Sequence, residues 1–547
     1  MNQDKSNPSL VESTILSIWE KTLGIKITSL EQNFFKMGGN SISAVKIIAE
    51  INRKLHFKLD PLDLFKSPTI RSLARVAEKQ LTPYPKMEII NNDAKIYATT
   101  PLQKSFFMLE HFKREGEFFH QPKIFWLEKS DDSLEILRAF EHVLKRHEIL
   151  RTTFHAEDKD VVQKIHELSE MSGYFHFWKL DKGDNFAKES RKTYERLLKH
   201  KFDLNEGPLC RLEVLKSEKQ CIAFLSIHHI ISDGFSEDII VKELLEYCNR
   251  QSQTQDNTLE YDLSRALKYQ FKDYAHGLNN WLGSKEGKFS RDYWLTHLNN
   301  YQKSNFPGNI HSSATDSFLA HCIDFKLGKS LTEKINKLAA NNNATQFMVL
   351  QALVKAFIYS YSGIKDIVVG SAFSVRPSDS EPPQIGPYLN TLPLRDQIDA
   401  EKTFIDFLSQ VKETIIMAYA HRHIPISDLV SKNGAFVSKH LWNVGLTLQN
   451  QAECLPEYSG IFDNLLEERK FNDGLTTNIW LDVIIEDDQM VFQVFYRQAL
   501  FEKSQIEDIC HKLKAIITQL VNDPNTTLKS ITSYETIKRK IDIQLNF

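Results

Sequence analysis

Two adjacent histidines followed by an aspartate are residues whose types and spacing could support catalysis. Residues 221–234 read CIAFLSIHHIISDG, so His228 and His229 end an apolar run and Asp233 follows four residues later. An imidazole that titrates near neutral pH can accept a proton from an attacking nucleophile or hold that nucleophile in place. The spacing therefore indicates a general base, or a positioning group, at the end of a β-strand.

Alternation along a strand turns adjacent side chains to opposite faces, so the two imidazoles should point in opposite directions. We expect His229 to face a cavity, His228 to pack inward and Asp233 to anchor the loop. This geometry disfavours zinc, because the two histidines do not readily reach one ion and no cysteine or carboxylate cluster lies nearby. The residues alone also allow two ordinary strand-end histidines that bind backbone groups.

Ser41 is the second candidate for chemistry. Residues 33–51 read NFFKMGGNSISAVKIIAEI, in which two glycines precede Asn40 and Ser41, and apolar residues then recur at helical spacing. The pattern predicts that a helix begins at Ser41. A hydroxyl at this position can cap the helix. It can also carry a phosphodiester, since unpaired N–H groups and the helix dipole favour negative charge there.

The segment that must position Ser41 has the pattern of a small helical bundle. Helical periodicity covers three stretches within residues 8–80, namely 10–23, 41–55 and 69–80. Residues 81–96 contain two prolines and many polar residues, which is typical of a linker running into an edge strand. We therefore expect a domain boundary within 81–96.

The segment that must position the histidines has an α/β pattern. Strand-like runs such as 221–227 and 366–371 alternate with helical patterns such as 236–247. The polar stretch 249–260, NRQSQTQDNTLE, separates two halves. We place them at 97–265 and 266–540.

Composition excludes several classes of protein. The 547 residues allow three or four domains, and 41% hydrophobic with 25% charged residues argues against disorder and coiled coil. A formal net charge of −3 provides no general attraction to nucleic acid or anionic lipid. The most apolar stretch, 347–361, is interrupted by Gln351 and Lys355, and the six cysteines form no CxxC pair. We expect no membrane span, no metal, reduced thiols and a cytoplasmic location.

Three segments resemble, in this order, a peptidyl carrier protein of nonribosomal peptide synthetases: SIWEKTLGI, QNFFKMGGNSI and LFKSPTIRSLA. The resemblance covers residues 10–80 and implies a small all-α four-helix bundle. In that family the serine matching Ser41 carries a covalent 4′-phosphopantetheine arm, whose thiol holds an amino acid or peptide as a thioester. Asn40 stands where the family often has His or Asp.

Six further segments resemble the core motifs of nonribosomal peptide condensation domains. They are PLQKSFFML (101–109), RHEILRTTF (146–154), HHIISDGFS (228–236), FKDYAHGLNNWL (271–282), RDYW (291–294) and IGPYLNTLPLR (385–395). The resemblance covers nearly all of 97–540. It implies an α/β (α+β) body of two pseudo-symmetric, chloramphenicol-acetyltransferase-like lobes in a V, with a tunnel at their junction that carrier arms enter. The implied activity is acyl transfer that forms an amide.

The resemblance also implies roles for individual residues. His228 and His229 form the catalytic pair, and His229 assists attack of an acceptor amine on the donor thioester. Asp233 is expected to pair with an arginine, and Arg376 in SVRPSDS occupies the matching position. Gly234 is expected to leave room for an arm or substrate.

Other residues are expected to serve the scaffold. Ser236 is expected to cap the following helix, and His147 and Arg151 are expected to support the site from beneath. Two segments depart from the family pattern: residues 421–426 read HRHIPI where HQDxPF is usual, and Pro387-Tyr388 replaces a Phe-rich part of IGxFVNT.

The resemblance leaves two alternatives to condensation: an epimerisation domain, which also follows carriers and has paired histidines, and a non-catalytic platform that docks carriers. Since no adenylation motif is recognisable, the implied partners include an adenylation domain on another module. The other implied partners are upstream and downstream carriers, a phosphopantetheinyl transferase, and an acceptor amine. Neither nucleic acid nor a membrane is expected as a partner.

Overall fold

A computed structural model describes most of the chain. The described ranges are 10–77 without 56 and 58, 94–111, 122–127, 133–158, 160–251, 266–301, 320–377, 384–431, 441–449 and 477–531, with the single residues 85, 87, 89, 90, 263 and 306. Cys454 and most of the predicted linker and of the polar stretch 249–260 lie outside them. Within these ranges, no helix is both long and apolar enough to cross a membrane.

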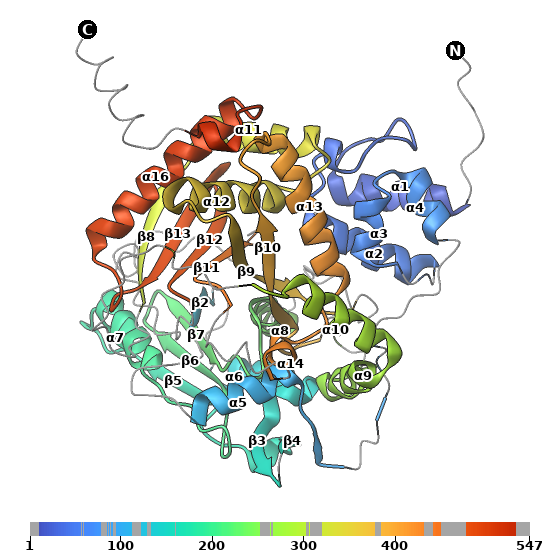
Figure 1. Ribbon diagram of the computed structural model, residues 1–547. Helices are drawn as coiled ribbons and strands as arrows, with labels where there is room; N and C mark the ends of the chain where they lie inside the picture. The colour runs from blue at the N-terminus through green and yellow to red at the C-terminus, as the bar shows by residue number, and fades with distance from the viewer. Residues whose placement is uncertain are drawn as a thin grey trace.

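The N-terminal bundle consists, in its described part, of four helices (Figure 1). They are α1 (Leu10–Leu23), α2 (Ser41–Leu55), α3 (Pro61–Lys66) and α4 (Ile70–Ala77). The patterns over 10–23 and 41–55 match α1 and α2 residue for residue. Helix α3 begins where the Asp60 side chain caps it and Pro61 supplies a fixed φ at the first helical position. Trp19, Phe34 and Ile48 are fully buried in the bundle's own core.

The first half of the larger body holds two small sheets. One has the order β1-β4-β3 and the other β2-β7-β6-β5. The strands are β1 (Ile96–Ala98), β2 (Lys123–Trp126), β3 (Thr152–Glu157), β4 (Asp160–Ile165), β5 (Phe175–Lys179), β6 (Cys210–Lys216) and β7 (Cys221–Ile227). The helices are α5 (Pro101–His111), α6 (Ser133–Arg146), α7 (Phe186–Leu198) and α8 (Gly234–Gln251). All seven residues of β7 are buried, as its continuous apolar run predicts.

The second half is built on a six-stranded sheet in the order β10-β9-β11-β12-β13-β8. The strands are β8 (Ala320–Lys326), β9 (Asp366–Ser374), β10 (Leu389–Gln397), β11 (Val444–Gln449), β12 (Ile479–Glu486) and β13 (Gln489–Arg497). Strand β11 runs parallel to both of its neighbours, and the other pairs are antiparallel. The sheet is therefore mixed.

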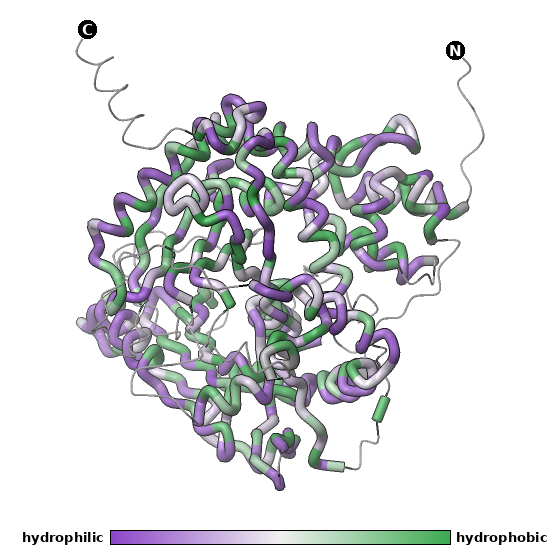
Figure 2. The backbone as a smooth tube through the Cα atoms, in the orientation of Figure 1, coloured by the Kyte–Doolittle hydropathy of each residue, from purple (hydrophilic) through white to green (hydrophobic). Residues whose placement is uncertain are grey.

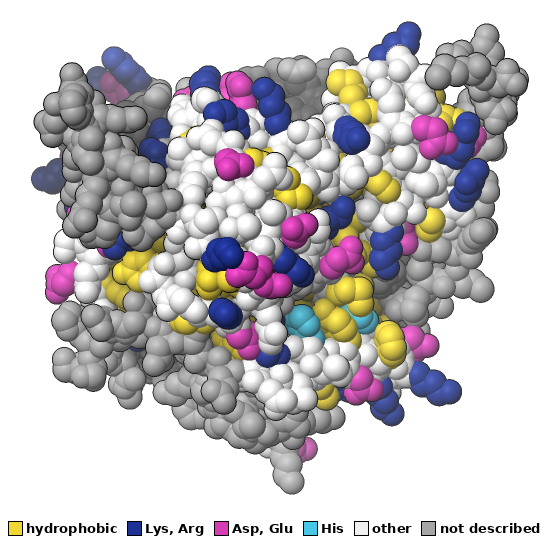
Figure 3. Space-filling model, turned by 45° about the horizontal axis from the view of Figure 1, so that its top comes forward, with side chains coloured by type: hydrophobic (Ala, Val, Ile, Leu, Met, Phe, Trp, Pro, Cys, Tyr) yellow, Lys and Arg dark blue, Asp and Glu magenta, His cyan; other side chains and the backbone are white. Residues whose placement is uncertain are grey.

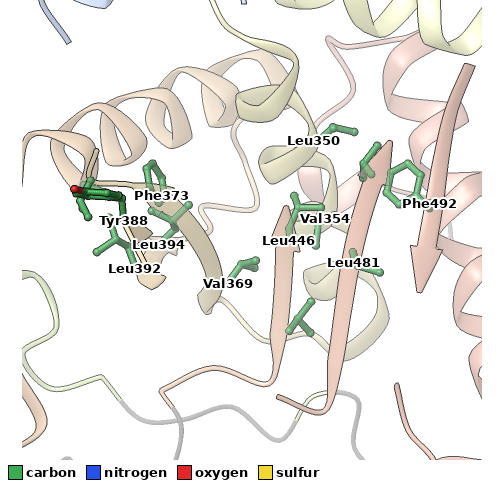
Figure 4. Packing of buried hydrophobic residues seen from close by; sticks show 14 of the residues in the cluster. Leu350, Val354, Val369, Phe373, Tyr388, Leu392, Leu394, Leu446, Leu481 and Phe492 are labelled. Carbon is green, nitrogen blue, oxygen red and sulfur yellow. The ribbon is translucent and has the colours of Figure 1, made fainter. Parts of the chain in front are cut away.

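Helices cover this second sheet. They include α11 (Lys329–Asn341), α12 (Gln346–Ser362), α13 (Phe404–Ala420) and α16 (Lys503–Asn522). Leu350 and Val354 of α12 lie close to Leu446 of β11 (Figure 4). Residues 348–358 of this helix are all buried, because it packs on the sheet and on the helices α11, α13 and α16 as well. In Figure 2, polar and apolar residues alternate along the outer helices.

Three more helices lie near the junction of the two halves: α9 (Phe271–Gly283), α10 (Lys285–His297) and α14 (Ile426–Ser431). Helix α9 falls in the range predicted for the second lobe, yet it packs on β1 and on the short turn η2 (Glu148–Arg151) of the first. One hydrophobic core cluster runs through both halves. On the face shown in Figure 3, acidic and basic side chains are interspersed.

Candidate active site

The two histidines directly follow strand β7, at the start of a loop that ends where α8 begins. His228 is 1% exposed, and its Nδ1 accepts a hydrogen bond of 3.0 Å from the backbone N–H of Ile230. Its Nε2 lies 3.6 Å from the carboxylate of Glu110 on α5. The ring of Phe202 meets it edge-on at 6.0 Å. His228 therefore packs inward and shapes the loop.

His229 has a different environment. Its side chain is partly exposed, and its ring lies 6.5 Å from the ring of Phe106 on α5. Within the described ranges, no hydrogen bond engages either nitrogen of its imidazole. The ring nitrogens are therefore available to a reacting group, whereas those of His228 lie in the protein interior.

Asp233 anchors the other end of the loop. Its Oδ1 accepts hydrogen bonds from the backbone N–H of Ser236 at 2.8 Å and from the Ser236 hydroxyl at 2.6 Å. Asp233 is thus the N-cap of α8. The prediction that Ser236 caps this helix is wrong: Ser236 lies in the first turn and donates to the cap, because the helix begins at Gly234.

Arg376 pairs with Asp233 across the junction of the two halves. Its Nη2 donates to the two carboxylate oxygens at 3.0 and 3.2 Å, and to the Ser236 hydroxyl at 3.0 Å. The guanidinium lies 4.8 Å from the ring centre of Phe235 and 4.4 Å from that of Tyr388. The arginine expected from the sequence is therefore in contact with Asp233, as one member of a larger network.

The segment 384–388 completes this network. The backbone N–H of Tyr388 donates to Asp233 at 3.0 Å. The Ser236 hydroxyl oxygen accepts from the N–H of Gly386 at 3.1 Å and lies 2.9 Å from the carbonyl oxygen of the same residue. Burial raises the pKa of Tyr388 well above its ordinary value, so its phenol stays neutral and donates to Gln384 at 2.6 Å. The departure Pro387-Tyr388 thus supplies a buried ring that supports Arg376.

Gly234 stands at an open position. The residue is exposed, and a Cβ added to it would meet no atom within 4 Å. A Cβ added to Gly386 would lie 2.0 Å from the ring of Phe271. The first glycine therefore borders unfilled space, and the second is required by packing.

His147 and Arg151, the residues expected to support the site, lie away from the open side of the loop. His147 is buried, and its Nε2 lies 3.0 Å from a carboxylate oxygen of Glu243 on α8. Arg151 donates through Nε to the carbonyl oxygen of Leu144 at 2.8 Å. Both residues hold helices in place.

Three residues near the histidines were not singled out from the sequence: Gln103, Phe106 and Glu110. All three lie on α5, where Gln103 donates to the carbonyl oxygen of Ile230 at 3.3 Å. The PLQKSFFML segment contains the first two, so it was the available signal. It could not show that α5 lies against the histidine loop, because that contact joins segments 127 residues apart.

Ser41 is the first residue of α2, as predicted, but it does not cap the helix. Asn40 is the cap: its Oδ1 accepts from the backbone N–H groups of Ile42 at 3.0 Å and Ser43 at 2.9 Å. In turn, the Ser43 hydroxyl oxygen accepts a hydrogen bond from the backbone N–H of Asn40 at 2.8 Å. Because Asn40 caps, the partly exposed Ser41 hydroxyl is available for a covalent group.

Two family models divide the chain where the fold does. The phosphopantetheine attachment site model matches residues 13–77, and the condensation domain model matches residues 93–540. The chain belongs to the condensation domain family. Its N-terminal bundle is a phosphopantetheine attachment domain, the kind of domain that holds this cofactor covalently on a serine.

Relatives of this condensation domain chain are peptide synthetases. Gramicidin S synthase 2 of Aneurinibacillus migulanus is 27% identical over 98% of the chain, and bacitracin synthase 3 of Bacillus licheniformis is 30% identical over 95%. The chain spans only 12% and 8% of the length of these curated relatives.

Solved structures share the fold of the condensation domain. The X-domain from teicoplanin biosynthesis matches with a TM-score of 0.67 and 22% identity, over 82% of this chain and all of that one. The epimerization domain from the third module of tyrocidine synthetase B matches with a TM-score of 0.65 and 16% identity, over 80% of this chain and 99% of that one. The predicted fold, a helical carrier followed by an α/β condensation domain, is confirmed.

Proposed function

We propose that this chain forms an amide in nonribosomal peptide synthesis, by moving an acyl or peptidyl group from its carrier to an acceptor amine. In this proposal residues 8–80 are the carrier, 81–96 the linker, and 97–265 and 266–540 the two lobes. The observation that supports it best is the position of His229, partly exposed at the end of β7 on a loop anchored from both lobes.

Ser41 is the proposed attachment site of 4′-phosphopantetheine. Its hydroxyl begins α2, is partly exposed and is not needed as a cap. When bound, this cofactor supplies a thiol that holds the acyl group as a reactive thioester. The residues at the start of α2 fit such a group, because a helix N-terminus favours the negative charge of a phosphodiester.

His229 is the proposed catalytic residue. Amide formation joins the amine nitrogen to the carbonyl carbon, breaks the carbon–sulfur bond and passes a proton from the nitrogen to the departing sulfur, which leaves as the free thiol. The His229 imidazole can accept that proton or hold the amine in line. His228, through its bond to Ile230, fixes the backbone that presents His229. Asp233 and Arg376 hold the far end of the loop, and Gly234 leaves space beside it.

Other modules are the proposed partners. An adenylation domain and an upstream carrier would supply the acyl group, a phosphopantetheinyl transferase would modify Ser41, and a downstream carrier or free amine would accept. Domains of both kinds found here occur together in the multidomain relatives.

The test begins with conversion of Ser41 by coenzyme A and a phosphopantetheinyl transferase, followed by intact-protein mass. With an acyl group on the arm and an amine in solution, the wild-type chain should form an amide, and His229→Ala should slow it by about 10²–10⁴-fold. His511→Ala, which removes an exposed histidine of α16, is the matched control and should leave the rate unchanged.

Two outcomes would contradict this proposal. Uptake of solvent deuterium at Cα of the tethered residue, without amide formation, would identify an epimerisation domain. Binding of carriers with no turnover, unaffected by His229→Ala, would identify a docking platform.

A further inference from the structure

The carrier rests on the condensation domain through α3, which packs on α13, and through the short turn η1 (Phe35–Met37), which packs on α11. Leu62 of this helix is buried within the core cluster of the condensation domain. Phe65 stacks on Phe35 inside the carrier at 5.6 Å and also meets the ring of Tyr419, at the end of α13, at 6.3 Å. Helix α3 therefore packs apolar side chains against the carrier and against the condensation domain.

An ion pair lies within this contact. Arg422, just beyond α13, donates through Nη2 to Oδ2 of Asp60 at 2.8 Å, and the two side chains are only 6% and 3% exposed. The guanidinium also lies 4.1 Å from the ring centre of Tyr419. Asp60 uses its other oxygen to cap α3, accepting from the N–H of Leu62 at 2.9 Å.

Burial makes this ion pair selective for a carrier that has an acidic residue at the position of Asp60. A charge removed from water is costly unless an opposite charge meets it, so Arg422 without an acidic partner would strongly disfavour the contact. A carrier with a neutral residue at the position of Asp60 would leave Arg422 buried without this carboxylate. Arg422 also lies in the segment HRHIPI, at the place where the family usually has glutamine.

The turn that carries Arg422 is held from inside the domain. Asn390 on β10 donates to the carbonyl oxygens of Arg422 at 2.8 Å and of Ile424 at 2.7 Å. The next residue, His423, lines a small cavity between the lobes together with Thr100 and Tyr274. Arg422 is therefore presented on a fixed turn, with its guanidinium toward the carrier.

We propose that the end of α13 and the turn after it form a docking surface for a carrier with an acidic N-cap on its third helix. By this surface the condensation domain recognises its own carrier. Ser41 follows η1 by four residues and lies outside α3; in the docked chain Ile42 and Val45, in the first turns of α2, are 36% and 44% exposed. Docking therefore leaves Ser41 open to modification.

The test uses the full chain with Asp60→Asn and Arg422→Gln, alone and together. Asn caps a helix as well as Asp does, so Asp60→Asn removes the charge and keeps the cap. Each single variant should speed hydrogen exchange in α3 and in the last turns of α13 by about tenfold or more. The double variant should exchange more slowly than either single one, because it removes both charges of the buried pair together.

Glu50→Gln is the matched control, because it removes a carrier carboxylate whose partly exposed ion pairs, with Arg53 and Lys54, lie within α2 and not at the contact with the condensation domain. It should leave exchange in α3 unchanged. Phosphopantetheinylation of Ser41 should proceed at the wild-type rate in all variants; if Asp60→Asn is not modified, its carrier has unfolded, and Arg422→Gln, which changes the other domain, decides the question alone.

Exchange in Arg422→Gln equal to that of the wild type, or single effects that simply add in the double variant, would overturn the inference. The inference rests on the proposed function only in giving the docked carrier a role. Because exchange is read without turnover, a chain that docks but forms no amide would refute the proposed function and leave this inference standing.

Discussion

Asp233 shows how much one side chain contributes to this site. It caps α8, pairs with Arg376 and accepts from the backbone of Tyr388. The sequence predicted the acid and its arginine, because both lie in recognisable segments. It assigned the cap to Ser236, since serine is a common N-cap and the start of the helix was placed two residues late.

Asp233→Asn should destabilise the protein by about 3–5 kcal/mol, because Asn can still cap α8 but leaves the largely buried guanidinium of Arg376 uncompensated. Chemical unfolding of the two proteins measures the difference. The control is Glu195→Gln, which removes a carboxylate that pairs with Arg191 at a site where both side chains are about half exposed, and it should cost about 1 kcal/mol or less. Equal losses in the two variants would contradict the argument.

His421 should make the chain sensitive to mild acid. Burial, with a smaller contribution from Lys66, lowers its pKa to about 4 from an ordinary value of 6.5. Between pH 6.5 and 4 the unfolded chain binds a proton at this residue and the folded chain does not, so stability falls as the pH falls through this window. The full effect is on the order of 3 kcal/mol.

Burial also lowers the pKa of His423, so this residue too makes the protein less stable in acid. The contribution of His421 is therefore obtained by comparing a His421 variant with the wild type. His421→Asn keeps a polar atom near the hydroxyl of Ser290, which lies 3.1 Å from Nδ1. The unfolding free energies of this variant and of the wild type are measured from pH 7 to pH 4. Between these limits the free energy of unfolding should fall less in the variant than in the wild type. Parallel curves would show that His421 does not titrate differently on folding.

The unit that positions the site is strand β7, its loop and helix α8. Its strand was predicted residue for residue, because seven apolar residues in a row leave little choice. Helix α8 extends beyond the predicted 236–247 at both ends. Helix α5, which brings Phe106 to His229, could not be assigned to this unit from sequence.

Gly234→Ala should separate function from folding. An added methyl group meets no protein atom, and alanine favours the helical conformation at the start of α8, so thermal stability should be retained or rise slightly. Amide formation should fall by about tenfold or more, since the methyl group enters the space beside His229 that an arm or substrate needs. Stability by calorimetry and the rate of acyl transfer provide the two measurements.

Gly386→Ala is the matched control for that variant. Its Cβ would lie 2.0 Å from the ring of Phe271, so the melting temperature should fall clearly together with the rate. A wild-type transfer rate in Gly234→Ala would exclude the proposed role of the space beside this glycine.

A small hydrophobic cluster joins α7 to the sheet β2-β7-β6-β5, and the described residues otherwise form two large hydrophobic cores. One belongs to the carrier, and the other runs through both lobes of the condensation domain, linked at the junction by Asp233, Arg376 and the segment 384–388. A continuous core makes the two lobes one cooperative unit, whereas the carrier meets them through α3 and η1.

Leu73→Ala should therefore unfold the carrier selectively. Leu73 is fully buried in the carrier core, and its truncation should cost about 2–5 kcal/mol, a large share of the stability of so small a domain. Ser41 should no longer be modified, while the condensation domain keeps its own unfolding transition. Val369→Ala, in the core of the second lobe, should instead destabilise the condensation domain and leave the modification of Ser41 unchanged. Loss of both domains in either variant would refute two separate cores.

The sequence by itself determined the order of the two domains, the helices α1 and α2, the strand β7 and the candidate residues Ser41, His229 and Asp233, because apolar periodicity and short motifs are local properties of the chain. Only the tertiary structure decided which neighbours those residues meet. The contacts of Arg376 with Asp233 and with the ring of Phe235, the approach of α5 to His229 and the pairing of Asp60 with Arg422 all join distant segments. Such contacts arise from packing in three dimensions, which no local pattern specifies.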